Sequence, residues 1–540
     1  MQLALGTRVL PWLPLLWQSP SPPQRLPQPC ANLSLPLIPD AEIVSITSRE
    51  VHNYTLPQFP GQQLSFCDVN ITLTHTDADE AEYNDFAHVS VWLPLNATDW
   101  NGRFQATGGG GLAAGFPSGP LQILAVSQGY VAAATDGGLT LNGTIDPQSG
   151  SWALRPDGSL NTALLDNYAH RSTHDLAVIG KILTERFYGK PPTYSYFRGC
   201  STGGRQGYFA AALYPRDFDG ISAAAPGINL PHLFGTFFWP PILMMHGVVP
   251  PQCVFEVFQK AVVEKCDPLD GAVDGLISNY LPEACQFDPA VLVGKTVDCE
   301  ETKSTVTITP KHARLVHQIL KGPHLSDGRK LWHGLAPGAS FRGIANTVAR
   351  NGSDIMTIKP FGPIVGWTKN FVFQDPTYDV FAMDFVDFDV AAILSIAKFR
   401  GILGSEDHRL FGFQRAGGKL LSWHGLADEI IPSSGTVTFR QWVEEDVGGP
   451  EVADGFYRLF LAPGVGHCGG GYGPVPTEEM EALVRWVEEG RAPDTLAAEI
   501  VDSAGEKVSR QLCRYPDALV YDGHGDVKLA SSFHCGSLDG

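Results

Sequence analysis

Short apolar runs alternate with helical stretches along much of the chain, and this pattern predicts a sheet flanked by helices. The predicted strands lie at 42–46, 89–93, 130–135, 194–197, 218–224, 419–424 and 457–461. Residues 168–187, 206–213 and 478–490 have the pattern of helices. Strands that alternate with helices are typical of an α/β fold with a parallel sheet.

The alternation stops between residues 228 and 395, where aromatic residues and prolines cluster. Four of the ten cysteines follow the cluster, at Cys253, Cys266, Cys285 and Cys299. We interpret 228–395 as an inserted lid domain. The catalytic domain would then come in two parts, 28–227 and 396–540. Residues 30–98 read as an N-terminal β-region.

The first 27 residues begin with Arg8 and an apolar run and then become rich in proline and serine, which is typical of a secretory signal. A truncated or mis-started signal, or an unstructured leader, fits equally. N-glycosylation sequons occur at Asn32, Asn53, Asn70, Asn96, Asn142 and Asn351. Ten cysteines, an even number, then predict disulfides in a secreted, extracellular protein.

The composition is that of a folded protein, and its charge predicts that it does not bind polyanions. Of the 540 residues, 44% are apolar and 18% charged, so a large core can form. The net charge of −19 argues against nucleic acid or an anionic membrane as a partner, since phosphate needs clustered Lys and Arg. Beyond the leader, no run of 18 apolar residues predicts a membrane span.

One stretch combines a strand, a tight turn and a helix around Ser201. The segment 194–214 contains the only GxSxG of the chain, within GCSTGGRQG. Flanking glycines allow the sharp turn that lifts a serine hydroxyl clear of a sheet. This is the context that the nucleophile elbow of an α/β-hydrolase requires, and it adds to what the pentapeptide alone indicates.

Four consecutive glycines end the strand in RFQATGGGG, at 108–111. In α/β-hydrolases such a loop supplies one backbone N–H of the oxyanion hole, and the residue after the nucleophile supplies the other. We therefore predict that Gly109 and Thr202 hold the oxyanion. A merely flexible loop is the alternative.

A serine nucleophile needs a base, and the base needs a carboxylate that fixes its tautomer. The order expected on this fold is Ser, acid, His. Strand KLLSWHG runs into the loop that carries Asp428, and strand YRLFLAPG runs into the loop that carries His467. We predict Ser201, Asp428 and His467 as the triad, with Glu429 as the rival acid.

Cysteines stand beside two of these residues. Cys200 precedes the nucleophile and Cys468 follows the base. If Ser201 meets His467, the two sulfurs come within bridging distance. A disulfide would hold both loops together, and a strong reductant should then impair catalysis. A free cysteine at the elbow is the alternative.

These residues resemble the tannase and feruloyl esterase family of secreted fungal and bacterial enzymes. GCSTGGRQG, HGLAD and GVGHCGGG carry the resemblance, which spans roughly 30–540. It implies an α/β-hydrolase fold with a large inserted lid domain and a Cys200–Cys468 disulfide. It also implies hydrolysis of esters of aromatic acids, such as ferulic, p-coumaric or gallic acid, through an acyl-enzyme.

Within the lid, CDPLDGAVDGLIS spaces three carboxylates over a glycine-relieved turn. Hard oxygen ligands in such a loop suit Ca²⁺, although the spacing is not that of an EF-hand. The family resemblance implies a structural calcium site made by Asp267, Asp270 and Asp274 with the backbone carbonyls of Ala272 and Leu276. An acidic turn without metal is the alternative.

The resemblance also implies disulfides between Cys266 and Cys285 and between Cys513 and Cys535. Cys30 with Cys67, and Cys253 with Cys299, are the pairs that remain. The chain departs from the family pattern here, because members usually carry a further close pair after the calcium loop and another near the N-terminus. Those last two pairings stay open.

The sequence thus predicts a serine carboxylic ester hydrolase, with a feruloyl esterase first and a tannase as the alternative. A catalytically inactive calcium-dependent binding module and a serine peptidase are the rivals from other classes. We expect a small-molecule or plant-polymer aromatic ester as the substrate. The oligomeric state is unknown from the sequence.

Overall fold

A computed structural model describes residues 27–55, 63–75, 85–281, 284–350, 355–404 and 408–538. The predicted leader, apart from its last residue, and the sequon at Asn351 lie outside this part of the chain. In the part that is described, none of the helices combines the length and apolar character that a membrane span requires.

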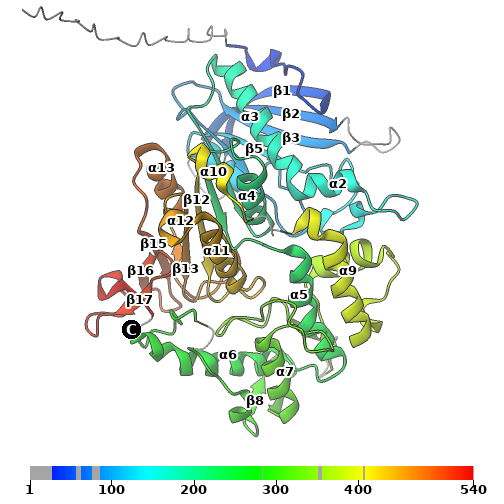
Figure 1. Ribbon diagram of the computed structural model, residues 1–540, viewed down its shortest axis with the longest axis vertical. Helices are drawn as coiled ribbons and strands as arrows, with labels where there is room; N and C mark the ends of the chain where they lie inside the picture. Colours follow the sequence, from blue (N-terminus) through cyan, green and yellow to red (C-terminus); the bar gives the residue numbers. More distant parts are fainter. Residues whose placement is uncertain are drawn as a thin grey trace, which may run out of the picture.

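A mixed sheet of nine strands forms the centre of the molecule (Figure 1). In spatial order the strands are β1 (Ala41–Thr55), β2 (Gln63–His75), β3 (Ala87–Pro94), β5 (Val131–Thr135), β4 (Arg103–Thr107), β6 (Tyr194–Cys200), β7 (Gly220–Ala224), β12 (Lys419–Gly425) and β13 (Tyr457–Ala462). The first four pair antiparallel. From β5 to β13 every pair is parallel, as the alternation of strands and helices predicts.

Helices cover both faces of the parallel strands. Neighbouring residues in a strand point to opposite faces, so Tyr196 and Phe197 enter two different cores. The core with Phe197 also receives α3 (Ser172–Tyr188), α4 (Thr202–Leu213) and α11 (Ser433–Val447). The core with Tyr196 receives α1 (Pro120–Ser127) and α13 (Glu479–Glu489). Burial on both faces explains why these strands read as apolar runs.

The lid comprises the elements between β7 and β12. Its helices are α5 (Leu230–Met245), α6 (Gln252–Cys266), α7 (Pro310–Lys321), α8 (Gly362–Gly366), α9 (Phe385–Leu403) and α10 (Phe411–Ala416). The lid also contains two short hairpins, β8 (Thr296–Cys299) with β9 (Ser304–Thr307) and β10 (Thr347–Ala349) with β11 (Met356–Ile358). The predicted boundary at 395 is wrong because it falls inside α9. Phe388 and Phe399, on either side of that boundary, enter the same lid core, so the helix cannot be divided there.

The lid core reaches into the catalytic part of the chain. Leu112, Trp152 and Tyr168 belong to the same apolar cluster as Phe234 and Phe371 of the lid. The ring of Trp152 packs edge-on against Phe371 at 5.1 Å between centroids. Lid and catalytic part are therefore joined by a continuous apolar contact, and the functional cavity described below lies at this contact.

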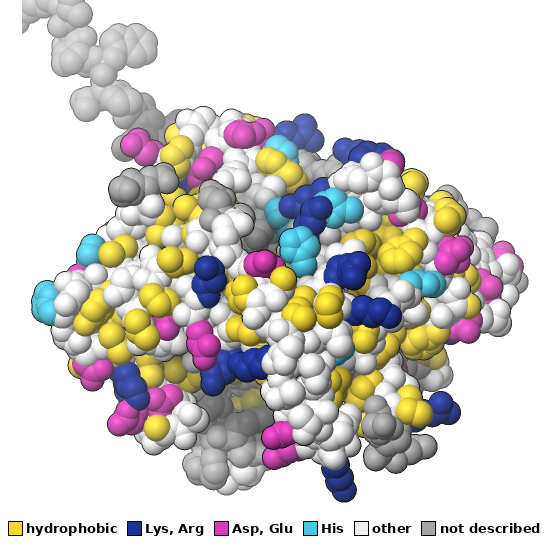
Figure 2. Space-filling model, turned by 90° about the horizontal axis from the view of Figure 1, so that it is seen from below, with side chains coloured by type: hydrophobic (Ala, Val, Ile, Leu, Met, Phe, Trp, Pro, Cys, Tyr) yellow, Lys and Arg dark blue, Asp and Glu magenta, His cyan; other side chains and the backbone are white. Residues whose placement is uncertain are grey.

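The C-terminal region carries two small antiparallel sheets that the sequence pattern did not indicate. One consists of β14 (Val475–Pro476), β15 (Thr495–Val501) and β16 (Lys507–Cys513). The other pairs β17 (Ala518–Tyr521) with β18 (Phe533–Gly536). On the face shown in Figure 2, basic side chains appear alongside acidic and apolar ones although the net charge is −19.

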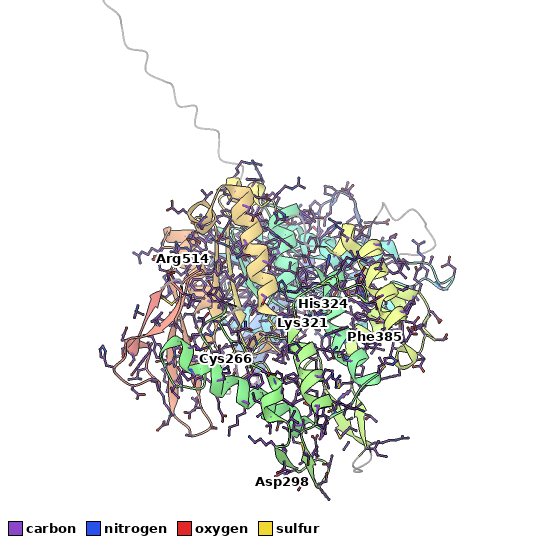
Figure 3. All side chains as sticks on the ribbon, turned by 60° about the horizontal axis from the view of Figure 1, so that its bottom comes forward. Cys266, Asp298, Lys321, His324, Phe385 and Arg514 are labelled. Carbon is purple, nitrogen blue, oxygen red and sulfur yellow. A yellow bond between two sulfur atoms is a disulfide. The ribbon has the colours of Figure 1, made fainter. Side chains whose placement is uncertain are left out.

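Five disulfides link the ten cysteines, and no free cysteine remains among them. The pairs are Cys30–Cys67, Cys200–Cys468, Cys253–Cys299, Cys266–Cys285 and Cys513–Cys535. The two pairings that the sequence left open therefore form as well. Cys266, labelled in Figure 3, ends α6 and ties the start of the acidic loop to the chain that follows it.

Candidate active site

Ser201 lies at the turn between β6 and α4 in a conformation that few L-residues adopt. Its backbone has φ 63° and ψ −121°, and such strained positions cluster at functional sites. The Ser201 N–H donates to the Ala224 carbonyl, and the Ser201 carbonyl accepts from the Gly227 N–H, both at 3.0 Å. The neighbouring chain thus holds the strained residue in place, as a nucleophile elbow requires.

Glycines around Ser201 allow two backbones to touch. A Cβ on Gly199 would lie 2.5 Å from the Gly203 carbonyl carbon, and one on Gly108 would lie 2.5 Å from the Gly203 Cα. The Gly203 N–H donates to the Gly109 carbonyl at 3.0 Å. The elbow and the loop 108–111 are therefore packed backbone against backbone, which no larger residue would permit.

Asp428 and His467 follow β12 and β13 and meet at the end of the sheet. His467 Nδ1 lies 2.8 Å from Asp428 Oδ2. Because an ionised carboxylate only accepts, Nδ1 carries the proton, and Nε2 remains as the basic nitrogen. Asp428 is fully buried, and its other oxygen accepts the N–H groups of Ile430 and Ile431.

Glu429, the rival acid, has a different contact. Its Oε2 accepts the backbone N–H of His467 at 3.1 Å. The carboxylate that binds the imidazole ring is thus that of Asp428, and Glu429 supports the loop that carries the ring.

His424 is a site residue that the sequence reasoning missed. It is fully buried, and its Nε2 lies 3.1 Å from Asp428 Oδ2 while its Nδ1 contacts the Thr436 hydroxyl. Its position at the end of the predicted strand, four residues before Asp428, could have identified it as a site residue. Asp428 therefore receives hydrogen bonds from two imidazoles.

The charges of this network shift the pKa values of both partners. Burial disfavours the charged form of His467, but the Asp428 carboxylate outweighs it and raises the pKa of His467 above its usual 6.5. Burial would likewise raise the pKa of Asp428, yet the two imidazoles hold it well below its usual range. Asp428 therefore stays ionised and stabilises a protonated His467.

A disulfide ties the two catalytic loops together. Cys200 and Cys468 are 268 residues apart in sequence, and their Cα atoms are 5.9 Å apart. Their neighbours Ser201 and His467 are brought to the same end of the sheet. The hydrogen bonds of the described chain do not include one between Ser201 Oγ and His467 Nε2, and such contacts are often long before substrate binds.

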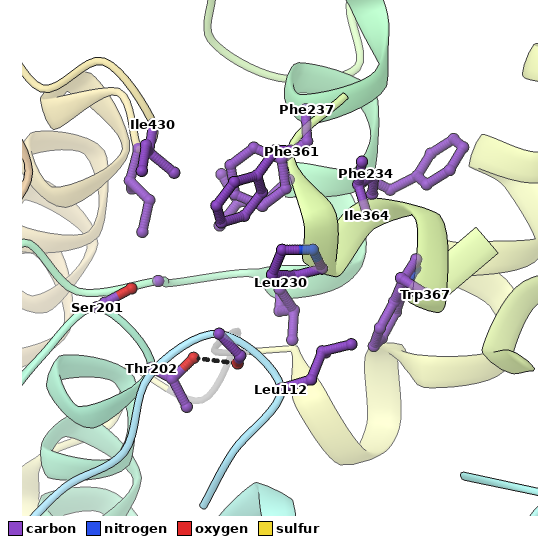
Figure 4. Close-up of a pocket in the computed structure, with 15 residues that line it drawn as sticks. Leu112, Ser201, Thr202, Leu230, Phe234, Phe237, Phe361, Ile364, Trp367 and Ile430 are labelled. Atoms are coloured by element: carbon purple, nitrogen blue, oxygen red, sulfur yellow. Dashed lines mark hydrogen bonds between the residues drawn. The ribbon is translucent and has the colours of Figure 1, made fainter. Parts of the chain in front are cut away.

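The predicted oxyanion donor Gly109 is wrong. Its N–H donates to the side-chain oxygen of Gln206 at 2.9 Å and is buried, so it cannot reach an oxyanion. Gly111 and Thr202 line the cavity beside Ser201 instead, and neither N–H has an acceptor in the described chain. The Gly111 carbonyl accepts the hydroxyl of Thr202 at 2.6 Å (Figure 4). It also accepts the hydroxyl of Tyr168 at 2.7 Å.

An apolar cavity opens at Ser201, between the loop 108–111 and the lid. It is lined by Gly111, Leu112, Ser201, Thr202, Gly227, Leu230, Leu233, Phe234, Phe237, Phe361, Pro363, Ile364, Trp367, Ile430 and Ile431 (Figure 4). The Trp367 N–H already donates to the Ser395 hydroxyl at 3.1 Å. Beyond Ser201 and Thr202, the lining side chains therefore present carbon surface.

The acidic loop, residues 267–276, carries more negative than positive charge. Asp267 and Asp270 each accept two backbone N–H groups, and Asp274 forms a buried ion pair with Arg510. Burial raises the pKa of Asp274 to about 6. Three carboxylates against one guanidinium fit a divalent cation by charge and by donor type. In the described chain, however, no three such side chains are grouped around one point.

Comparisons with known proteins agree with this geometry. A family model described as tannase and feruloyl esterase matches residues 70–536. A probable feruloyl esterase of Arthroderma benhamiae is 44% identical over 520 residues, which cover 94% of this chain and 93% of that protein. A probable feruloyl esterase B-2 of Aspergillus terreus is 32% identical and covers 83% of this chain and 82% of its own.

Two solved structures share the architecture. Feruloyl esterase B from Aspergillus oryzae superposes with a TM-score of 0.75 at 26% identity, covering 93% of this chain and 97% of that one. A tannin acyl hydrolase from Aspergillus niger gives a TM-score of 0.82 at 24% identity, covering 94% and 93%. The α/β fold expected from the sequence is thereby confirmed.

Proposed function

The chain belongs to the tannase and feruloyl esterase family, and from this premise we propose that it is a carboxylic ester hydrolase that acts on hydroxycinnamate esters, with ferulate esters first. The observation that carries the proposal is the buried Asp428–His467 pair, tied by a disulfide to a strained serine. A vestigial elbow in an inactive binding module would have no need for this arrangement.

In the proposed reaction, Ser201 Oγ attacks the ester carbonyl while His467 Nε2 takes its proton. His467 then gives that proton to the leaving alcohol, and an acyl-enzyme remains on Ser201. Water, activated by the same imidazole, releases the acid. Asp428 holds the imidazole in the Nδ1–H tautomer, and we assign the oxyanion to the N–H groups of Thr202 and Gly111.

The apolar cavity favours a feruloyl over a galloyl acyl group. A galloyl ring carries three hydroxyls, and each hydroxyl buried without a partner costs about 1–3 kcal/mol. The side chains that line the cavity present almost only carbon to such a ring. The names of the relatives in Arthroderma and Aspergillus point in the same direction.

The test compares kcat/KM for methyl ferulate, methyl p-coumarate and methyl gallate in the wild-type protein and in Ser201→Ala. We expect turnover of the first two, weak or no turnover of the gallate, and loss of all turnover in the variant. A fluorophosphonate should label the wild type and not the variant. An unlabelled, inactive wild type would support the binding module, and a preference for gallate would support a tannase.

We further propose that the acidic loop holds a structural Ca²⁺, with Asp267, Asp270 and Asp274 and the carbonyls of Ala272 and Leu276 as ligands. The excess negative charge of the loop supports this assignment. When bound, the ion would supply charge neutralisation rather than catalysis. Chelation should lower the melting temperature before it lowers kcat. An unchanged melting curve, with no metal found by elemental analysis, would contradict it.

Secretion and glycosylation belong to the same proposal. Five disulfides favour an oxidising compartment. Five sequon residues, Asn32, Asn53, Asn70, Asn96 and Asn142, have exposed side chains that a glycosyltransferase can reach. Endoglycosidase treatment of protein from a secreting host should lower its mass, and an unchanged mass would argue against glycosylation.

A further inference from the structure

A second cavity lies next to the apolar one and differs from it in chemistry. The two share the side chains of Phe361 and Ile430. The second cavity is lined by Gln259, Ser340, Arg342, Gly343, Asn346, Lys359, Pro360, Phe361, Gly362, Ala427, Glu429, Ile430, Gly471 and Tyr472. Of the two cavities, this one encloses the larger open space.

The polar cavity lies on the side of the catalytic base. Glu429 follows Asp428 directly, and Gly471 and Tyr472 end the loop that begins at His467. Glu429 also holds the His467 backbone N–H. In the proposed hydrolysis the base must protonate the leaving oxygen, so the alcohol part of the ester has to lie on this side. The apolar cavity, which opens at Ser201, then takes the acyl part.

The charged side chains that line the polar cavity are mostly basic, although the whole protein is acidic. Lysine and arginine number 38 against 57 aspartate and glutamate residues, yet this cavity contains Arg342 and Lys359 against Glu429 alone. Lys359 is exposed and has no acidic partner within the described chain. One oxygen of the Glu429 carboxylate, Oε2, already accepts the backbone N–H group of His467.

Arg342 is held only by a surface ion pair. Its guanidinium lies 2.5 Å from Glu256 Oε1, and both side chains are more than half exposed, at 57% and 53%. Such pairs contribute little because water screens them. A ligand carboxylate, which a guanidinium binds through two parallel hydrogen bonds, can therefore replace Glu256 or bind beside it.

We propose that the polar cavity is the subsite for the alcohol part of the substrate and that it selects an alcohol bearing a carboxylate, such as a cyclic hydroxy acid or a uronate sugar. Arg342 and Lys359 bind the carboxylate. The side-chain amide of Asn346 lines the cavity and can bind a hydroxyl group, whereas Gln259 Nε2 already donates to the Gly338 carbonyl. This inference rests on the proposed ester hydrolysis. It adds a preference for the charge of the alcohol part, which recognition of the acyl part alone cannot produce.

The experiment compares two substrates that differ in one charge. Feruloyl quinate presents a free carboxylate on the alcohol side, and its methyl ester is the neutral match with the same feruloyl group. We expect kcat/KM to be about fivefold higher for the carboxylate at low salt. The ratio should approach one at high ionic strength, because salt screens the attraction.

The variants Arg342→Gln and Lys359→Gln should each lower this ratio, and the double variant should abolish it. Lys321→Gln is the matched control, since Lys321 ends α7 and lines a different cavity (Figure 3); it should keep the wild-type ratio. A ratio of one in the wild type, or a ratio that survives in the double variant, would overturn the subsite. Absence of turnover on methyl ferulate would instead overturn the proposed function.

Discussion

The two loops that meet at the Cys200–Cys468 disulfide differ in the contacts that hold them. The nucleophile loop, 199–204, is held by backbone contacts with the loop 108–111, where glycines touch glycines. The base loop, 464–471, has close backbone contacts as well, and side chains hold it in addition, because Asp428 binds its imidazole and Glu429 binds its backbone. An added atom therefore disturbs the backbone of either loop, whereas the base loop alone also depends on the charge of a carboxylate.

Removal of one charge at the base loop should give the largest effect. Asp428→Asn keeps the size of the side chain but removes the charge that stabilises protonated His467, and an amide can impose the wrong tautomer. We expect kcat on methyl ferulate to fall by about 10⁴-fold. Steady-state kinetics, with circular dichroism to confirm folding, provides the measurement.

Glu429→Gln is the matched control for that variant. It removes a charge one residue away that contacts the backbone and not the ring. Its effect on kcat should be far smaller. If the two variants lost equal activity, Glu429 would share the orienting role and the distinction between the two acids would fail.

Loss of the disulfide should separate the two loops and have the next largest effect. With Cys200→Ser and Cys468→Ser together, each loop keeps its own contacts but the spacing between Ser201 and His467 is no longer fixed. We expect kcat/KM to fall by about 10²-fold, since displacements near 1 Å have this effect. Reductant should act on the wild type in the same way.

The pair Cys513→Ser and Cys535→Ser is the control for the disulfide prediction. It removes a bridge between β16 and β18, neither of which carries a triad residue. Its kcat/KM should stay close to that of the wild type. An equal loss in both double variants would show that general destabilisation, and not loop spacing, explains the effect.

An added methyl group should be the sharpest test of the nucleophile loop. In Gly199→Ala the new Cβ meets the Gly203 backbone at 2.5 Å, where nothing flexible can yield. We expect the free energy of unfolding to fall by about 1–3 kcal/mol, measured by urea denaturation. Gly401→Ala in α9, where a Cβ meets nothing within 4 Å, should be neutral or stabilising.

The pH profile should give the smallest effect and reports on the base loop alone. His467 must be neutral to accept the serine proton, and Asp428 raises its pKa above 6.5. The value of kcat/KM should therefore fall about tenfold per pH unit as the pH drops below that raised pKa. A midpoint below 6.5 would mean that burial outweighs the Asp428 charge.

The sequence pattern predicted those features of the structure that depend on residues close together in the chain. The strands before Ser201, Asp428 and His467 are apolar because both faces of the sheet are covered, so their ends could be located. The strained turn at Ser201 follows from its flanking glycines. Order along the chain then placed three side chains at one end of a parallel sheet.

Contacts between distant side chains could not be predicted in this way. Gln206 takes the N–H of Gly109 across 97 residues, and Arg510 pairs with Asp274 across 236. Neither partner has a sequence signature. The lid boundary failed for a related reason, since α9 continues to Leu403 only because both its halves pack into one core.

The disulfide beside the triad also determines where in a cell activity can begin. It closes a segment of 268 residues that contains the whole lid, so the ribosome must finish nearly the entire chain before the bond can form. In a cytosol kept reduced by glutathione the two sulfurs stay apart. We therefore expect that a producer strain has to route this chain through an oxidising compartment to obtain active protein.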